Sequence, residues 1–112
     1  MGRALRALSW LLLAGVVVAR SPAAVAAPRG AVHTVVIEGM LFIPATLKVK
    51  AGDTVIWKNK DAFPHTATSV ARLFDSKPIA SGASWKFVAT RRGTFAYLCT
   101  LHQTMKGMLT VE

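Results

Sequence analysis

The sequence predicts an all-β fold, a Greek-key β-sandwich, and three observations lead to it. Apolar and polar residues alternate with a period of two in several short segments between residues 32 and 112. Turn residues such as those at 51–53 and 91–93 separate these segments. After residue 26, no stretch carries the periodicity of an amphipathic helix. About seven closely spaced strands without a helix favour two sheets packed face to face.

Each of the first three expected strands has two apolar residues on alternate positions, as one buried sheet face requires. In order, they are residues 32–38 (Val35, Ile37), 46–50 (Leu47, Val49) and 54–58 (Val55, Trp57). Residues 59–69 are polar and irregular and predict a loop. Residues 74–81 predict a bend with a short strand.

The last three expected strands follow the same rule. They are residues 83–89 (Trp85, Phe87), 94–99 (Phe95, Tyr97, Cys99) and 107–112. We expect Met108 in the core of the final strand and His33 on the surface of the first.

Residues 1–26 have the pattern of a cleavable signal peptide. Two arginines near the start precede an apolar run of 12 residues, 8–19, and small residues follow at 23–27. We expect Sec-type export to the periplasm, cleavage after Ala26 and a single mature domain, residues 27–112. The alternative is an uncleaved membrane anchor, for which the run is short because a spanning helix needs about 20 apolar residues.

The mature domain is small, basic and without a disulfide. The whole chain has 112 residues and a formal net charge of +9; without residues 1–26, 11 basic residues face 5 acidic ones, a net charge of +6. The single cysteine excludes an intrachain disulfide. A domain of this size buries only about 60% of its unfolded surface, so a bound metal is a candidate for the missing stabilisation. The positive charge favours an acidic partner surface, whereas export makes nucleic acid an improbable partner.

One short segment carries an unusual set of metal-binding side chains. Cys99, His102 and Met105 occur as C-T-L-H-Q-T-M at the end of the penultimate expected strand. A thiolate, an imidazole and a thioether suit copper better than magnesium or calcium. Met108 competes with Met105 as the thioether, and the spacing favours Met105.

His65 is the candidate for a fourth ligand. It follows Phe63 and Pro64 just after an expected strand, and the proline restricts the backbone on both sides of itself. Two histidines and one cysteine with a weak axial methionine form the ligand set of a blue-copper electron-transfer site.

These residues and their flanking strands resemble the cupredoxins. The resemblance is carried by the segments T-V-I-W-K-N at 54–59, P-H at 64–65 and G-T-F-A-Y-L-C-T-L-H-Q-T-M-K-G at 93–107. The C-x2-H-x2-M spacing is that of the amicyanin branch, whereas plastocyanin and pseudoazurin have C-x2-H-x4-M.

The resemblance implies a role for each residue. His65, Cys99 and His102 would be equatorial ligands of one type 1 copper ion and Met105 the axial ligand, with the backbone N–H of Thr66 donating to the Cys99 sulfur. Two positions depart from the amicyanin pattern: Leu101 stands where a proline is common, and Thr66 where an asparagine ties the two ligand loops together. We expect a weaker tie from Thr66.

The function that follows is a periplasmic electron carrier that cycles between Cu(I) and Cu(II) and is not itself an enzyme. We expect a monomer. Its expected partners are redox proteins such as a cytochrome c or a periplasmic dehydrogenase, which would dock near Phe63, Pro64, Leu101 and His102. The alternative is a copper carrier or storage module. A copper oxidase or reductase would need a second copper site, for which only His33 is left, and methionine is a poor zinc ligand.

Overall fold

The computed structural model describes residue 2, residues 11–20 and residues 30–112. These residues contain eight strands and no helix, which confirms the all-β prediction. The strands are β1 (Val32–Glu38), β2 (Leu41–Ile43), β3 (Thr46–Val49), β4 (Asp53–Asn59), β5 (Thr68–Ser69), β6 (Ser84–Ala89), β7 (Gly93–Leu98) and β8 (Lys106–Val111). Nothing in the described ranges forms a helix long and apolar enough to cross a membrane. The predicted cleavage position after Ala26 lies outside the described residues, so the signal peptide and the domain boundary stay predictions.

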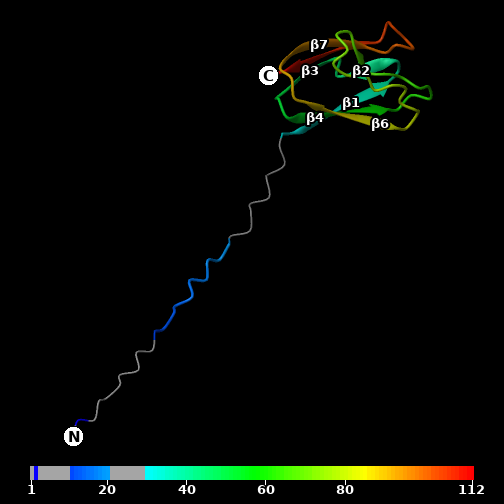
Figure 1. Cartoon of the computed structure of the whole chain (residues 1–112). Helices are drawn as coiled ribbons and strands as arrows, with labels where there is room; N and C mark the ends of the chain where they lie inside the picture. Colours follow the sequence, from blue (N-terminus) through cyan, green and yellow to red (C-terminus); the bar gives the residue numbers. More distant parts are fainter. Residues whose placement is uncertain (1, 3–10, 21–29) are drawn as a thin grey trace.

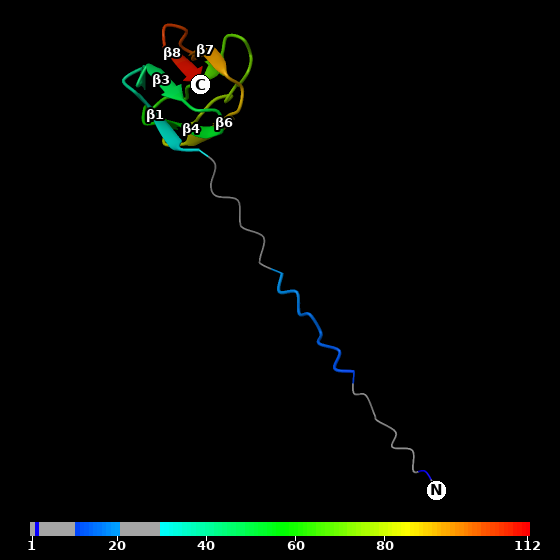
Figure 2. The ribbon, with the colours of Figure 1, turned by 90° about the vertical axis from the view of Figure 1, so that its left-hand side faces the viewer.

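The strands form two four-stranded sheets, in the orders β2-β1-β4-β6 and β3-β8-β7-β5. Both sheets are mixed, because β1 runs parallel to β4 and β3 runs parallel to β8, while the other pairs are antiparallel. Figure 2 shows the two layers, with β3, β8 and β7 in one and β1, β4 and β6 in the other. The chain enters β1 at the end of the sandwich where it also ends after β8 (Figure 1).

The core lies between the sheets and is rich in aromatic rings. Trp57 is fully buried at its centre, with ring centroids 5.4 Å from Phe74, 5.6 Å from Trp85 and 5.5 Å from Tyr97. The inward faces expected from alternation are confirmed for the buried residues Val35, Ile37, Val49, Val55, Trp57, Tyr97 and Cys99.

The structure differs from the predicted elements at three places. The two shortest strands, β2 and β5, were not predicted. Residues 74–81 form no strand, although Ile79 makes an isolated antiparallel bridge with His65. Met108 alternates with the buried Leu109 and Val111 and is itself only partly buried, so its assignment to the core is wrong.

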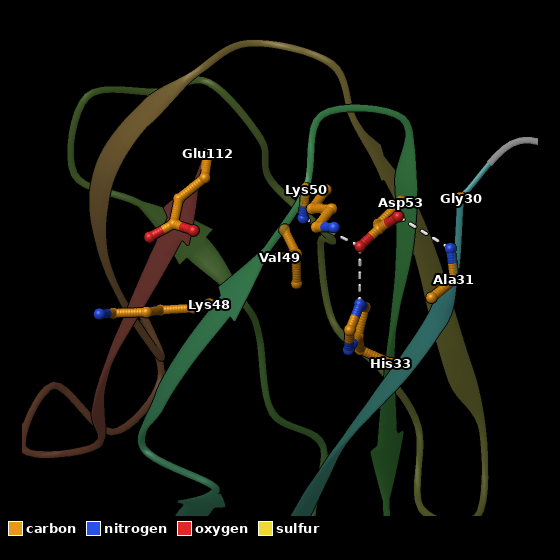
Figure 3. A pocket seen from close by; sticks show the side chains of 8 residues that line it. All are labelled: Gly30, Ala31, His33, Lys48, Val49, Lys50, Asp53 and Glu112. Carbon is orange, nitrogen blue, oxygen red and sulfur yellow. Dashed lines mark hydrogen bonds and ion pairs between the residues drawn. The ribbon is translucent and has the colours of Figure 1, made fainter.

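Asp53, at the first position of β4, ties three segments together at the end of the sandwich where the chain enters. Its carboxylate accepts the N–H groups of Ala31 and Lys50 at 2.8 and 2.9 Å and lies 2.8 Å from His33 Nε2. Figure 3 shows these contacts converging beside an open pocket. The Lys50 N–H is the largest cause that lowers the Asp53 pKa from 3.8 to about 2, and the His33 and Ala31 contacts add to it. His33 is therefore not merely a surface residue.

This pKa predicts loss of stability in acid. In the unfolded chain the Asp53 carboxylate takes up a proton as pH falls through 3.8, while in the folded protein it stays charged down to about 2. The Asp53 contribution to the free energy of unfolding is thus present above 3.8 and decreases as pH falls towards 2. Denaturant unfolding at a series of pH values should show this decrease in the wild type and a shallower one in Asp53→Asn. Glu38→Gln, at an exposed acid, is the matched control; equal pH slopes in all three proteins would contradict the assignment.

Candidate metal centre

Cys99, His102 and Met105 lie on the tight loop between β7 and β8. Cys99 directly follows the last residue of β7, and Met105 directly precedes the first of β8. Three backbone hydrogen bonds close the loop: Cys99 N–H to Met105 O (3.1 Å), His102 N–H to Cys99 O (3.3 Å) and Met105 N–H to His102 O (2.9 Å). The loop lies at the end of the sandwich opposite the chain's entry into β1 (Figure 1). The two strands and these bonds hold the three side chains in place before any metal binds.

His65 comes to the same place from the loop after β4. Its N–H donates to Ile79 O at 3.2 Å and its carbonyl accepts the Ile79 N–H at 2.7 Å. Asn59, the last residue of β4, supports the same loop by donating its side-chain amide to Phe63 O and Ile79 O. His65 is completely buried, so its ring position is set by packing as well as by the backbone.

The donor atoms of His65, Cys99 and His102 all lie within 4.8 Å of one another. Cys99 Sγ is 3.8 Å from His65 Nδ1 and 3.9 Å from His102 Nδ1. Two donors bound at about 2.0–2.3 Å to one metal ion are less than about 4.6 Å apart, so both sulfur–nitrogen pairs fit a shared ion. The predicted cluster of one thiolate and two imidazoles is thus brought together.

Met105 completes a donor set that fits copper. Its side chain is 2% exposed, and its backbone bonds bring it next to Cys99 and His102. Met108 lies instead within β8, opposite Ala96 of β7. A thiolate, two imidazoles and a thioether match the type 1 copper arrangement and no hard-metal site.

Comparisons with known proteins agree with this geometry. The family model of the cupredoxin-like domain matches residues 8–111. The chain is a member of the cupredoxin family. It is 33% identical over 97 residues to amicyanin from Paracoccus denitrificans (82% of this chain, 74% of the relative) and 32% identical over 91 residues to plastocyanin from Scenedesmus fuscus (65% and 88%). A solved Cu(I) structure of a methionine-to-alanine variant of amicyanin matches with a TM-score of 0.68 and 31% identity, over 72% of this chain and 82% of that one.

Thr66 connects the two ligand loops of this cupredoxin. Its backbone N–H donates to Cys99 Sγ at 3.3 Å, the contact that the family resemblance implied. Its hydroxyl oxygen accepts the Thr100 N–H at 2.8 Å. Thr66 is 2% exposed and its contact with the sulfur is buried, whereas the contact with Thr100 is partly buried. The threonine therefore ties the two loops directly, and whether this tie is weaker than that of an asparagine stays a prediction.

Asp61 is a site residue that sequence reasoning missed. Its Oδ2 lies 2.8 Å from His65 Nε2, so this ring nitrogen carries the proton and Nδ1 is left with its lone pair towards Cys99. The carboxylate also accepts the N–H groups of Gly39 and Met40 in the β1–β2 turn. The Met40 N–H is the largest cause that holds the pKa of Asp61 below its usual range. An acid four residues before a histidine was the available signal.

The predicted docking residues are exposed, apart from His102, whose ring is partly buried. Its centroid is 5.0 Å from that of His65, whereas Phe63 and Leu101 are 59% and 50% exposed and Pro64 is exposed as well. His102 is thus the histidine of the cluster that reaches solvent, and the docking surface stays a prediction.

Proposed function

We propose that this cupredoxin is an exported, periplasmic type 1 copper protein that carries single electrons between redox partners. The observation that carries the proposal is the convergence of the His65, Cys99 and His102 donor atoms within 4.8 Å. The amicyanin and plastocyanin relatives favour the same function. The proposal includes residues 1–26 as a cleaved signal peptide and residues 27–112 as the working domain.

The protein's contribution to electron transfer is a rigid set of donors. Bound copper would supply one-electron exchange between Cu(II) and Cu(I), and His65, Cys99, His102 and Met105 would hold it. Soft sulfur donors and imidazoles are acceptable to both oxidation states, so the ligands need to move little. The β7–β8 loop bonds and the Asp61–His65 contact resist such movement. The Thr66 N–H donates to the Cys99 sulfur and would tune the potential of a bound copper ion by withdrawing charge from the thiolate.

Copper titration of purified residues 27–112 tests this proposal. We expect one equivalent of Cu(II) to produce an intense visible thiolate-to-copper charge-transfer band, and a cytochrome c to reduce and oxidise the protein reversibly. No band would remove the site assignment. A band without electron exchange, but with copper transfer to an acceptor protein, would favour the carrier or storage function.

Burial of the donors argues against the carrier alternative. Cys99 and His65 are both fully buried, whereas a protein that hands over its metal needs ligands that an acceptor can reach. An oxidase or reductase would need a second copper site. The remaining histidine, His33, lies near the start of β1 and contacts Asp53, away from the His65, Cys99 and His102 cluster. These two observations make electron transfer the better-supported function.

The axial ligand can be tested by a pair of methionine variants. Met105→Leu should still bind copper and keep the visible band, because the thiolate and both imidazoles remain. Its reduction potential should rise, since loss of the thioether removes electron density that stabilises Cu(II). Met108→Leu is the matched control and should leave the potential unchanged. Voltammetry of both variants measures the reduction potential. A shifted potential in Met108→Leu alone would assign the thioether ligand to Met108 instead of Met105.

The partner surface is proposed to be acidic. Residues 27–112 have a net charge of +6 even with the carboxylates of Asp53, Asp61 and Asp75 counted in full, because 11 basic residues face 5 acidic ones. Exposed basic residues include Lys48, Lys50, Lys58, Lys60, Arg91 and Arg92. Stopped-flow electron transfer with an acidic cytochrome c should slow by on the order of tenfold when salt is raised from low to physiological concentration. A basic cytochrome c is the control; the same salt dependence with both would contradict steering by this charge.

A further inference from the structure

Three threonine hydroxyls and one carboxylate form a continuous chain beside the metal centre. Thr66 Oγ1 lies 3.1 Å from Thr100 Oγ1 and 3.0 Å from Thr68 Oγ1, and it accepts the Thr100 N–H at 2.8 Å. Thr68 Oγ1 lies in turn 3.1 Å from Asp75 Oδ1. The chain therefore joins the His65 loop, the β7–β8 loop and the loop that follows β5.

The number of protons determines the direction of these hydrogen bonds. A hydroxyl has one proton to donate and two lone pairs that accept. Asp75 also accepts the Lys77 N–H at 2.9 Å, the main cause that lowers its pKa, so it is ionised and only accepts. Thr68 Oγ1 is placed to donate both to Thr66 Oγ1 and to Asp75 Oδ1, so its single proton is shared between these two acceptors. Thr66 Oγ1 accepts from Thr68 and from the Thr100 N–H, which uses both of its lone pairs, so its own proton is directed to Thr100 Oγ1.

We propose that Thr66 and Thr68 are positioning residues of the metal centre, through a hydrogen-bond chain that links Thr100, Thr66, Thr68 and Asp75. The proposal rests on the copper function for its effect on potential, but the chain itself is a property of the protein without metal. Its role is to hold Thr66, and with it the N–H that donates to the Cys99 sulfur, against the third loop.

The position of each threonine along this hydrogen-bond chain predicts how strongly its replacement by valine affects the metal centre. Thr66 is 2% exposed, so without its hydroxyl the Thr100 N–H loses its partner beside a buried site. Thr68 is half-buried and acts through Thr66, and removal of its hydroxyl leaves the bond from the Thr100 N–H in place. Thr66→Val should therefore have the larger effect and Thr68→Val a smaller effect in the same direction.

The first test uses the metal-free protein. Cys99 is fully buried, so an aromatic disulfide reagent reaches its thiol only when the loops open. We expect Thr66→Val to speed labelling by about tenfold and Thr68→Val by about threefold, the effects of one lost and one weakened hydrogen bond on the opening equilibrium. Thr66→Ser and Thr68→Ser keep the hydroxyl and should react like the wild type.

Thr94→Val is the matched control, because Thr94 and Thr110 form a similar hydroxyl pair, 3.4 Å apart, at the other end of β7 and β8. If the Cys99 thiol of Thr68→Val is labelled no faster than that of Thr94→Val, the proposed hydrogen-bond chain is wrong. In the copper-loaded proteins, both valine variants should shift the reduction potential in the same direction, and both serine variants should restore it. If the valine variants only lowered the general stability of the domain, the serine variants would not be expected to restore the reduction potential. If the wild type forms no copper band, the proposed function fails while the labelling result still decides the hydrogen-bond chain.

Discussion

Replacing Cys99 by Ser is expected to abolish the visible copper band while leaving the domain folded. The band requires a thiolate sulfur, and a serine hydroxyl is neither ionised at neutral pH nor a soft donor. The fold should tolerate the change because serine is similar in size and its oxygen can accept the Thr66 N–H that now reaches the sulfur. Absorption during copper titration and unfolding of the metal-free variant measure the two parts separately.

The same variant tests whether copper stabilises a domain that has no disulfide. Copper at 100 times its dissociation constant should stabilise the wild type by about 2.7 kcal/mol, which raises Tm by roughly 10–20 °C for a domain of this size. Cys99→Ser should show only a small part of this increase. A band that persists in the variant, or an equal rise in Tm, would show that the metal binds elsewhere.

The central parts of the fold could be predicted because they depend on local pattern. Alternation over six or seven residues in β1, β4 and β7 gave both the strands and their buried faces. The short strand β2 escaped because three residues are too few to show a period. Its turn also contains Met40 with a positive φ of 61°, supported by Asp61, 21 residues further on. Contacts of this range leave no local signature.

The metal centre could be predicted to a similar extent. Cys99, His102 and Met105 share one loop, so their spacing alone indicated a site. His65 could be found only from a second motif, the Pro-His pair. The sequence did not show that its backbone forms an antiparallel bridge with Ile79, which lies in the loop after β5. Which strands lie parallel was also beyond the pattern, because alternation defines a buried face and not a neighbour.

The largest effect on stability is expected from Gly107→Ala. Gly107 pairs with Tyr97 across β7 and β8, and the Tyr97 ring lies over the glycine. A β-carbon at position 107 would overlap the ring at Cζ and the hydroxyl and lie 2.7 Å from Cε1. The ring cannot move away freely, because its centroid is 4.8 Å from that of Phe42 and 5.5 Å from that of Trp57.

Overpacking of this kind should lower the free energy of unfolding by about 3 kcal/mol, at the upper end for one added methyl group in a rigid core. Burial of the ring, which also raises the pKa of Tyr97 to about 12, leaves it no solvent-facing alternative of equal energy. Denaturant unfolding of the metal-free protein measures the change without a contribution from copper.

A double-mutant cycle separates this clash from a general intolerance of change at position 107. Tyr97→Leu removes the ring, and should itself cost about 2–4 kcal/mol because it leaves a cavity. In Gly107→Ala/Tyr97→Leu the new methyl group enters that cavity, so the total loss should be smaller than the two single losses added together, by more than about 1 kcal/mol. Additive losses would mean that the ring is not what requires a glycine. Because Met105 and Cys99 lie two residues from Gly107 and Tyr97 in the chain, the single variant should also weaken copper binding, whereas the double variant should recover part of it.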